Sequence, residues 1–133
     1  ANGHILDNIH LFHDGVGYAE SNLMFRNLGG GRFTNVSSKL GSDFTNPRVS
    51  RGAALGDYDN DGNLDIYVTN EGPNQLFRNL GKGKFADVTS KSGTAGGENA
   101  SAGAAFIDID SDGDLDILIA GQRSKNVVWY ENP

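Results

Sequence analysis

A repeat of about fifty residues constrains the fold of this chain more than any other feature. Residues 22–41 (NLMFRNLGGGRFTNVSSKLG) align without gaps to residues 74–93 (NQLFRNLGKGKFADVTSKSG), and twelve of the twenty paired positions are identical. Residues 52–66 (GAALGDYDNDGNLDI) align in the same way to residues 103–117 (GAAFIDIDSDGDLDI). The two alignments are offset by 52 and 51 residues, so one unit is repeating.

Each unit has the pattern of four short antiparallel strands. The segments RGAALGDY (51–58) and LDIYVTN (64–70) flank an aspartate-rich loop, and LDILIAG (115–121) has the β-branched residues typical of a buried strand. The segment NQLFRNLGKGKFADVTS (74–90) breaks at the glycines of residues 81–83, which indicates a hairpin turn. Four such strands in about fifty residues predict an all-β fold made of β-propeller blades.

The phase of the repeat predicts how the blades are distributed within one region over residues 1–133. Residues 1–41 match the end of a first blade with a long loop at 3–21, residues 52–93 match a complete blade, and residues 103–133 match the first three strands of a further blade. This makes about two and a half blades, whereas propellers typically close with about four to eight. We expect a partial propeller cut from a longer chain, or a unit completed by copies of itself or another chain.

Two nine-residue loops, DYDNDGNLD (57–65) and DIDSDGDLD (108–116), carry the clearest chemistry. Aspartates at loop positions 1, 3, 5 and 9 can converge on one point with the main-chain carbonyl at position 7, while glycine at position 6 permits the sharp reversal. Without a cation, these carboxylates would repel one another. The predicted metal ligands are Asp57, Asp59, Asp61, Asn63 and Asp65 in the first loop, and Asp108, Asp110, Asp112, Asp114 and Asp116 in the second.

Calcium is the cation that these loops suit best, because it accepts flexible coordination by oxygen alone. Magnesium prefers a stricter octahedron, and zinc or copper would want softer ligands. An EF-hand would need a glutamate at position 12, where Val68 and Ile119 stand. The alternative is a hairpin of Asx turns that binds nothing. Four aspartates in register, twice, exceed what a turn requires, so we expect two Ca²⁺ sites.

Composition excludes several classes of protein. The net charge is −6, but ten of the 17 acidic residues lie in or beside the two loops, and the 11 Lys and Arg are scattered, so nucleic acid is not an expected partner. No apolar run approaches the roughly 18 residues of a membrane span. The chain has no cysteine, which excludes disulfides. No nucleophile elbow, phosphate loop or triad order is present, so we do not expect an enzyme.

The units resemble FG-GAP/VCBS repeats, the calcium-loop blades also found in the integrin α-subunit propeller. The runs PRVSRGAALGDYDNDGNLDIYVTN (47–70) and LMFRNLGGGRFTNVS (23–37) resemble more narrowly the calcium-binding propellers related to cartilage acidic protein, the ASPIC-associated family. The resemblance implies a seven-bladed extracellular propeller whose loops bind calcium through the ligands given above. This chain has fewer blades and lacks the C-terminal domain usual in that family, so we expect a piece of a larger protein.

Several weaker signals have more than one interpretation. The long loop contains three histidines and two aspartates that could bind a transition metal, but their spacing matches no closed site, so we interpret them as polar loop residues: His4, His10, His13, Asp7 and Asp14. Triplets at Asn35 and Asn99 fit the N-glycosylation acceptor pattern.

Side chains that recur once per unit form a second group of weaker signals. Aromatic residues at matching positions could stack on sugars, but a core between blades is the simpler interpretation: Phe25, Phe77 and Trp129/Tyr130. Arginines also recur, which suggests a structural role in bridging blades: Arg26 and Arg78.

We expect a calcium-stapled module, secreted or on the cell surface, that acts in binding, adhesion or scaffolding. Its partner would be another protein, a glycan or copies of the same chain. One alternative is a structural protein that assembles into an extracellular fibre or ring by passing strands from copy to copy. Another is a lectin or carbohydrate-active enzyme on the same scaffold, because fold alone does not choose the ligand.

Overall fold

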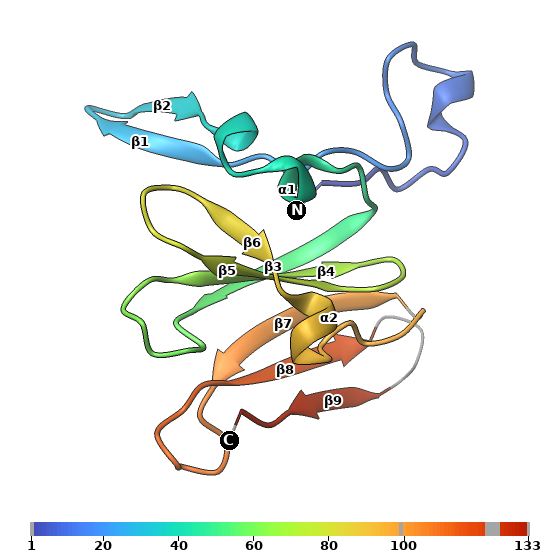
Figure 1. The fold of residues 1–133 in the computed structure, drawn as a ribbon. Helices are drawn as coiled ribbons and strands as arrows, with labels where there is room; N and C mark the ends of the chain where they lie inside the picture. Colours follow the sequence, from blue (N-terminus) through green and yellow to red (C-terminus); the bar gives the residue numbers. More distant parts are fainter. Residues whose placement is uncertain (1, 99, 122–125, 133) are drawn as a thin grey trace.

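The computed structural model describes residues 2–98, 100–121 and 126–132, which form mainly antiparallel β-structure (Figure 1). Sheets of two, four and three strands follow one another along the chain. The described strands are β1 (Phe25–Gly29) and β2 (Arg32–Asn35), then β3 (Ser50–Gly56), β4 (Asp65–Asn70), β5 (Gln75–Asn79) and β6 (Phe85–Asp87), then β7 (Ser101–Ile107), β8 (Asp116–Gly121) and β9 (Val127–Tyr130). The prediction of an all-β chain of propeller-type blades is confirmed.

Among the described residues, one short helix precedes β1, and three others lie between strands. They are η1 (Ile9–Leu11), η2 (Ser37–Lys39), α1 (Ser42–Thr45) and α2 (Thr89–Ser92). Within the described ranges, no helix is long and apolar enough to cross a membrane. The second triplet of the glycosylation pattern begins at Asn99, which lies outside the described residues.

The second and third sheets share one register. Ile66 of β4 pairs with Phe77 of β5, and Ile117 of β8 pairs with Tyr130 of β9. The register also shifts after the first residue of both β3 and β7. Residues 75–77 of β5 therefore have counterparts in β9, and residues 78–79 have counterparts in the two residues that follow β9, although Figure 1 shows these strands in separate sheets.

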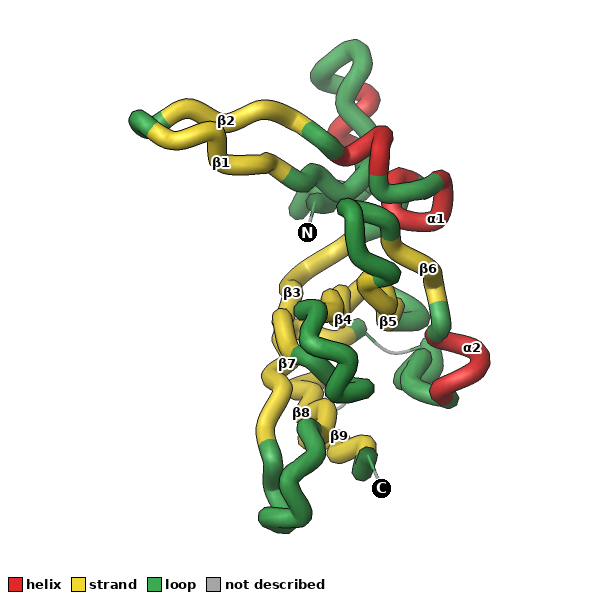
Figure 2. The backbone as a smooth tube through the Cα atoms, turned by 60° about the vertical axis from the view of Figure 1, so that its left-hand side comes forward, coloured by secondary structure: helices red, strands yellow, loops and turns green. Residues whose placement is uncertain are grey.

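Two apolar clusters hold the units together. The first joins Leu40 and Phe44, which follow β2, to Ile66, Val68 and Phe77 of the second sheet. The second joins residues of the second and third sheets: Tyr67, Leu76, Ile117 and Ile119. The sheets therefore pack face against face, as blades do, and β3 and β7 run next to each other in Figure 2.

A glycine permits the close approach of β3 and β7. A Cβ atom added to Gly56 would lie only 2.7 Å from Cβ of Phe106, which belongs to β7. Real carbon atoms do not approach that closely, so any side chain at this position would push the two strands apart. Gly56 immediately precedes the first aspartate loop, and the contact therefore fixes where that loop begins.

The recurring aromatic residues are only partly in the core. Phe77 is 1% exposed and belongs to the first cluster, as expected. Phe25 is 53% exposed and Trp129 is 45% exposed, so the core interpretation is wrong for these two. Phe25 lies in the two-stranded sheet, which offers less surface to cover it. The register matches Phe77 with Tyr130, and Tyr130 does pack against the second cluster.

Candidate metal centres

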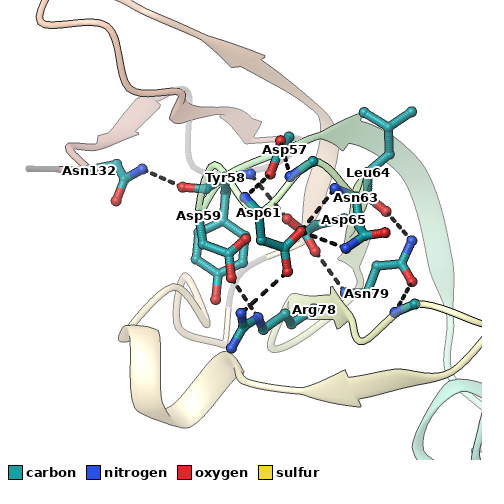
Figure 3. A network of polar contacts seen from close by, with 12 residues as sticks. Asp57, Tyr58, Asp59, Asp61, Asn63, Leu64, Asp65, Arg78, Asn79 and Asn132 are labelled. Carbon is teal, nitrogen blue, oxygen red and sulfur yellow. Dashed lines mark hydrogen bonds and ion pairs between the residues drawn. The ribbon is translucent and has the colours of Figure 1, made fainter.

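The first aspartate loop, residues 57–65, connects β3 to β4 and is shown in Figure 3. Oxygen atoms of Asp57, Asp59 and Asp61 all lie within 4.8 Å of one another. The Asp57 carboxylate accepts hydrogen bonds from the main-chain amides of Asp61 at 3.0 Å and Gly62 at 2.9 Å. Gly62 has φ of +85°, a conformation that favours glycine, so the loop reverses around the Asp57 carboxylate.

Asp65 is the last residue of the first loop. Its side chain is fully buried, and its two oxygens accept hydrogen bonds from the amides of Tyr58 at 3.0 Å and Asn79 at 2.7 Å. Burial raises the pKa of Asp65, and the nearby charges of Asp59 and Asp61 act in the same direction. Asp65 therefore ties both ends of the loop to β5, and a nearby cation would favour its charged form.

Arg78 of β5 reaches into the first loop. Its Nε lies 2.5 Å from Oδ2 of Asp59, and one terminal nitrogen lies 3.3 Å from Oδ2 of Asp61 (Figure 3). Hydrogen bonds from Asn63 and from Arg78 lower the pKa of Asp61, and the Asp59 carboxylate raises that of Arg78. We expected Arg78 to bridge blades, but its two ion pairs instead lie within its own unit.

The second loop, residues 108–116, repeats this geometry between β7 and β8. Oxygens of Asp108, Asp110 and Asp112 lie within 4.8 Å of one another. The amide of Gly113 donates to Asp108 at 3.2 Å, as Gly62 does to Asp57. Asp114 donates its amide to Asp112 at 2.9 Å.

Asp116 takes the place of Asp65 at the end of the second loop. It is fully buried and accepts hydrogen bonds from the amides of Ile109 at 3.0 Å and Asn132 at 2.9 Å. The bond from Asn132, followed by that from Ile109, lowers the pKa of Asp116. The pKa values of Asp65 and Asp116 shift in opposite directions because burial outweighs the hydrogen bonds at Asp65, with a smaller contribution from the charges of Asp59 and Asp61, whereas the hydrogen bonds outweigh burial at Asp116.

The two loops touch one another. The side-chain amide of Asn60 in the first loop donates to Oδ1 of Asp114 in the second. The side-chain amide of Asn132 donates to the main-chain carbonyl of Tyr58 at 2.6 Å and so joins the end of β9 to the first loop. Direct hydrogen bonds therefore link the two loops.

Each loop has one buried oxygen that the rest of the described chain does not satisfy. Oδ1 of Asp59 and Oδ1 of Asp108 are both buried without a described hydrogen-bond partner. Like charges this close repel by roughly 1 to 4 kcal/mol per pair, depending on the local dielectric. Both facts fit a hard cation held by Asp57, Asp59 and Asp61, and a second held by Asp108, Asp110 and Asp112.

The remaining predicted ligands stay predictions. Asp65 and Asp116 are buried and are not among the mutually close oxygens, although each of their oxygens has a second lone pair to offer. Asn63 and Asp114 stand at the positions where the main-chain carbonyl was expected to bind.

In the described part of the chain, the groups of three or more potential metal ligands that lie close together consist of aspartates alone, so the histidines of the long loop do not belong to one. His4 accepts a hydrogen bond from the amide of Leu6 at 3.1 Å, in agreement with a polar loop residue. The sequence analysis did not identify Asn79 and Asn132, whose main-chain amides donate hydrogen bonds to Asp65 and Asp116. The available signal was the repeated asparagine that follows Phe77-Arg78 and Tyr130-Glu131.

Comparison with known proteins agrees with this geometry. A family model described as an FG-GAP-like repeat matches residues 15–68 and 57–119. Cartilage acidic protein 1 of Xenopus tropicalis is 38% identical over 87 residues, which cover 64% of this chain and 13% of that protein. The proteins of that name from Mus musculus and Homo sapiens are 36% identical over 73 residues, covering 52% of this chain and 11% of each relative. The match spans only a small part of these relatives.

Proposed function

Because the chain belongs to the FG-GAP-like repeat family, we propose that it is a non-catalytic β-propeller-type module whose two aspartate loops each bind a calcium ion as a structural staple. The observation that carries this proposal is the pair of buried, unpartnered carboxylate oxygens, Asp59 Oδ1 and Asp108 Oδ1. Each belongs to a trio of carboxylates close enough to share one ion.

Calcium fits the chemistry of both loops. The donors are carboxylate and main-chain oxygens on a glycine-containing turn, which suits a large cation with flexible coordination. In each loop the bound ion would offset repulsion among the aspartates and satisfy the buried oxygen. Asp65 already connects the first loop to β5, and Asp116 connects the second loop to the residues after β9. An ion that binds the folded loops would therefore stabilise the folded blades.

We place this module outside the cell or on its surface. Millimolar calcium there would saturate even a modest site, so an ion could serve permanently as a staple. The relatives carry the name cartilage acidic protein, with which an extracellular role in binding, adhesion or scaffolding agrees. The partner would be another protein, a glycan or further copies of the chain.

Titration calorimetry with calcium tests the proposal. We expect two bound calcium ions per chain, with little binding of magnesium under the same conditions. Asp57→Asn should remove one ion and Asp108→Asn the other, because each changes one loop. Asp43→Asn, which removes a carboxylate outside both loops, should leave two. Absence of calcium binding, or binding that survives both loop substitutions, would overturn the proposal.

A further inference from the structure

We propose that the two calcium sites are unequal, with the loop at 108–116 binding its ion more tightly than the loop at 57–65, and that one position at the end of the neighbouring strand is the main cause of the difference. In the second unit this position holds Arg78, and in the third unit it holds Glu131. The inference rests on the proposed function, because it assumes that both loops bind calcium.

The register of the sheets makes Arg78 and Glu131 counterparts. Phe77 pairs with Ile66 as Tyr130 pairs with Ile117, so the residue after each aromatic occupies the same place. The next residue confirms the match, because the amide of Asn79 donates to Asp65 and that of Asn132 donates to Asp116. A cation in one unit is therefore replaced by an anion in the other.

Arg78 already supplies a countercharge to the first loop. It lies 2.5 Å from Asp59 and 3.3 Å from Asp61, and both aspartates belong to the trio that would hold the ion. An arriving calcium ion must share these carboxylates with a guanidinium that repels it. A unit charge at about 5–6 Å changes the affinity for a divalent ion by about three- to tenfold at a solvent-exposed site.

The second loop has no such countercharge among the described residues. Asp110 and Asp112 accept only hydrogen bonds from main-chain amides there. Glu131 adds a negative charge at the place that Arg78 occupies in the other unit. Asp114 also gives the second loop a negative charge where the first loop has Asn63, and this charge acts in the same direction, although its carboxylate accepts a hydrogen bond from Asn60 of the first loop. Arg78 has the larger effect, because it forms ion pairs with two of the three carboxylates that would hold the first ion.

This arrangement has a consequence for stability. Without calcium, Arg78 partly neutralises the first loop, whereas repulsion in the second loop is unrelieved. As the calcium concentration falls, the first loop should lose its ion before the second loop does. The first loop should nevertheless keep its conformation better than the second, because Arg78 remains paired with its carboxylates. The second loop should hold its ion to lower concentrations and then depend on it entirely.

Calcium titration of the ¹⁵N-labelled chain, followed by NMR, can read each site separately. The amides of Gly62 and Gly113 each donate to the first aspartate of their own loop, so each reports on one site. We expect the Gly113 signal to reach its calcium-bound position at a concentration about tenfold or more below that for Gly62.

Charge substitutions then test the cause. Arg78→Gln should tighten the first site by about three- to tenfold and leave the second unchanged. Glu131→Gln should weaken the second site more than the first. The matched control is Arg26→Gln, since Arg26 aligns with Arg78 but lies on the two-stranded sheet, away from the loops. It should alter neither site. In excess chelator Arg78→Gln should lower the melting temperature, whereas Arg26→Gln should not.

The outcomes separate this inference from the proposed function. If both glycines respond to calcium at the same concentration, or Gly62 responds first, the inference is overturned while calcium binding stands. The inference also fails if Arg78→Gln leaves the first site unchanged. If neither glycine responds to calcium, the proposed function and the inference fail together.

Discussion

The main-chain amide of Asn79 donates a 2.7 Å hydrogen bond to Oδ1 of Asp65, a carboxylate with no exposed surface. The side chain of Asn79 strengthens the same junction, since its amide donates to the carbonyl of Leu64 at 3.0 Å and its oxygen accepts from Gly81 at 3.0 Å. One residue thus fastens the end of the metal loop to the hairpin beyond β5.

Asn79→Ala should lower the free energy of unfolding by about 1–2 kcal/mol, because it removes two side-chain hydrogen bonds at a partly buried junction. The loss can be measured by urea unfolding. Asn132→Ala should have a similar effect, since the Asn132 side chain donates to the carbonyls of Tyr58 and Leu115.

The matched control for this prediction is Asn27→Ala. Asn27 aligns with Asn79, but its side chain makes one exposed hydrogen bond, to the amide of Gly29 at 2.8 Å. Its loss should cost about 0.5 kcal/mol or less. Equal losses in the free energy of unfolding for Asn27→Ala and Asn79→Ala would show that the side-chain hydrogen bonds of Asn79 have no special role.

Removal of calcium should destabilise the whole chain. A ligand present at about a hundred times its Kd stabilises the native state by about 2.7 kcal/mol per site. For two sites, excess chelator should therefore lower the melting temperature by about 10 °C or more. Added calcium should restore the melt and an equal concentration of magnesium should not. A melt that does not change in chelator would refute the staple role.

Gly56→Ala should be strongly destabilising, because its Cβ would collide with Phe106. We expect a loss of about 1–3 kcal/mol, typical of overpacking in a close-packed interior. Gly103→Ala is the control, since a Cβ there meets no described atom within 4 Å. Thermal unfolding of both variants in saturating calcium compares them, and similar melting temperatures would contradict the close approach of β3 and β7.

The repeat was sufficient to predict the strands and the two acidic loops. Local pattern determines these features, because alternating apolar residues, glycine turns and regular aspartate spacing act over a few residues. The turn after β6, which the sequence analysis did not predict, is also local: Asp87 accepts hydrogen bonds from the amide and hydroxyl of Thr89. Asn35 and Ser37 make the same bonds in the first unit, so the turn alone accounts for that triplet, and glycosylation of Asn35 stays a prediction.

The sequence did not reveal which side chains meet across strands. Arg78 recurs with Arg26, which suggested a bridge between blades, but its partner depends on register and on the face of β5 from which it projects. The exposure of Phe25 and Trp129 likewise depends on which surfaces cover each sheet, and a repeat pattern does not contain that information. Such long-range contacts require the assembled sheets.

The most direct test of the account is a crystal structure of the chain grown in calcium, with anomalous scattering used to locate the ions. We predict two anomalous peaks, one within about 2.3–2.6 Å of oxygens from Asp57, Asp59 and Asp61, and the other at the same distance from oxygens of Asp108, Asp110 and Asp112. Carboxylates turned toward solvent in both loops, with no peak between them in ample calcium, would contradict the central claim.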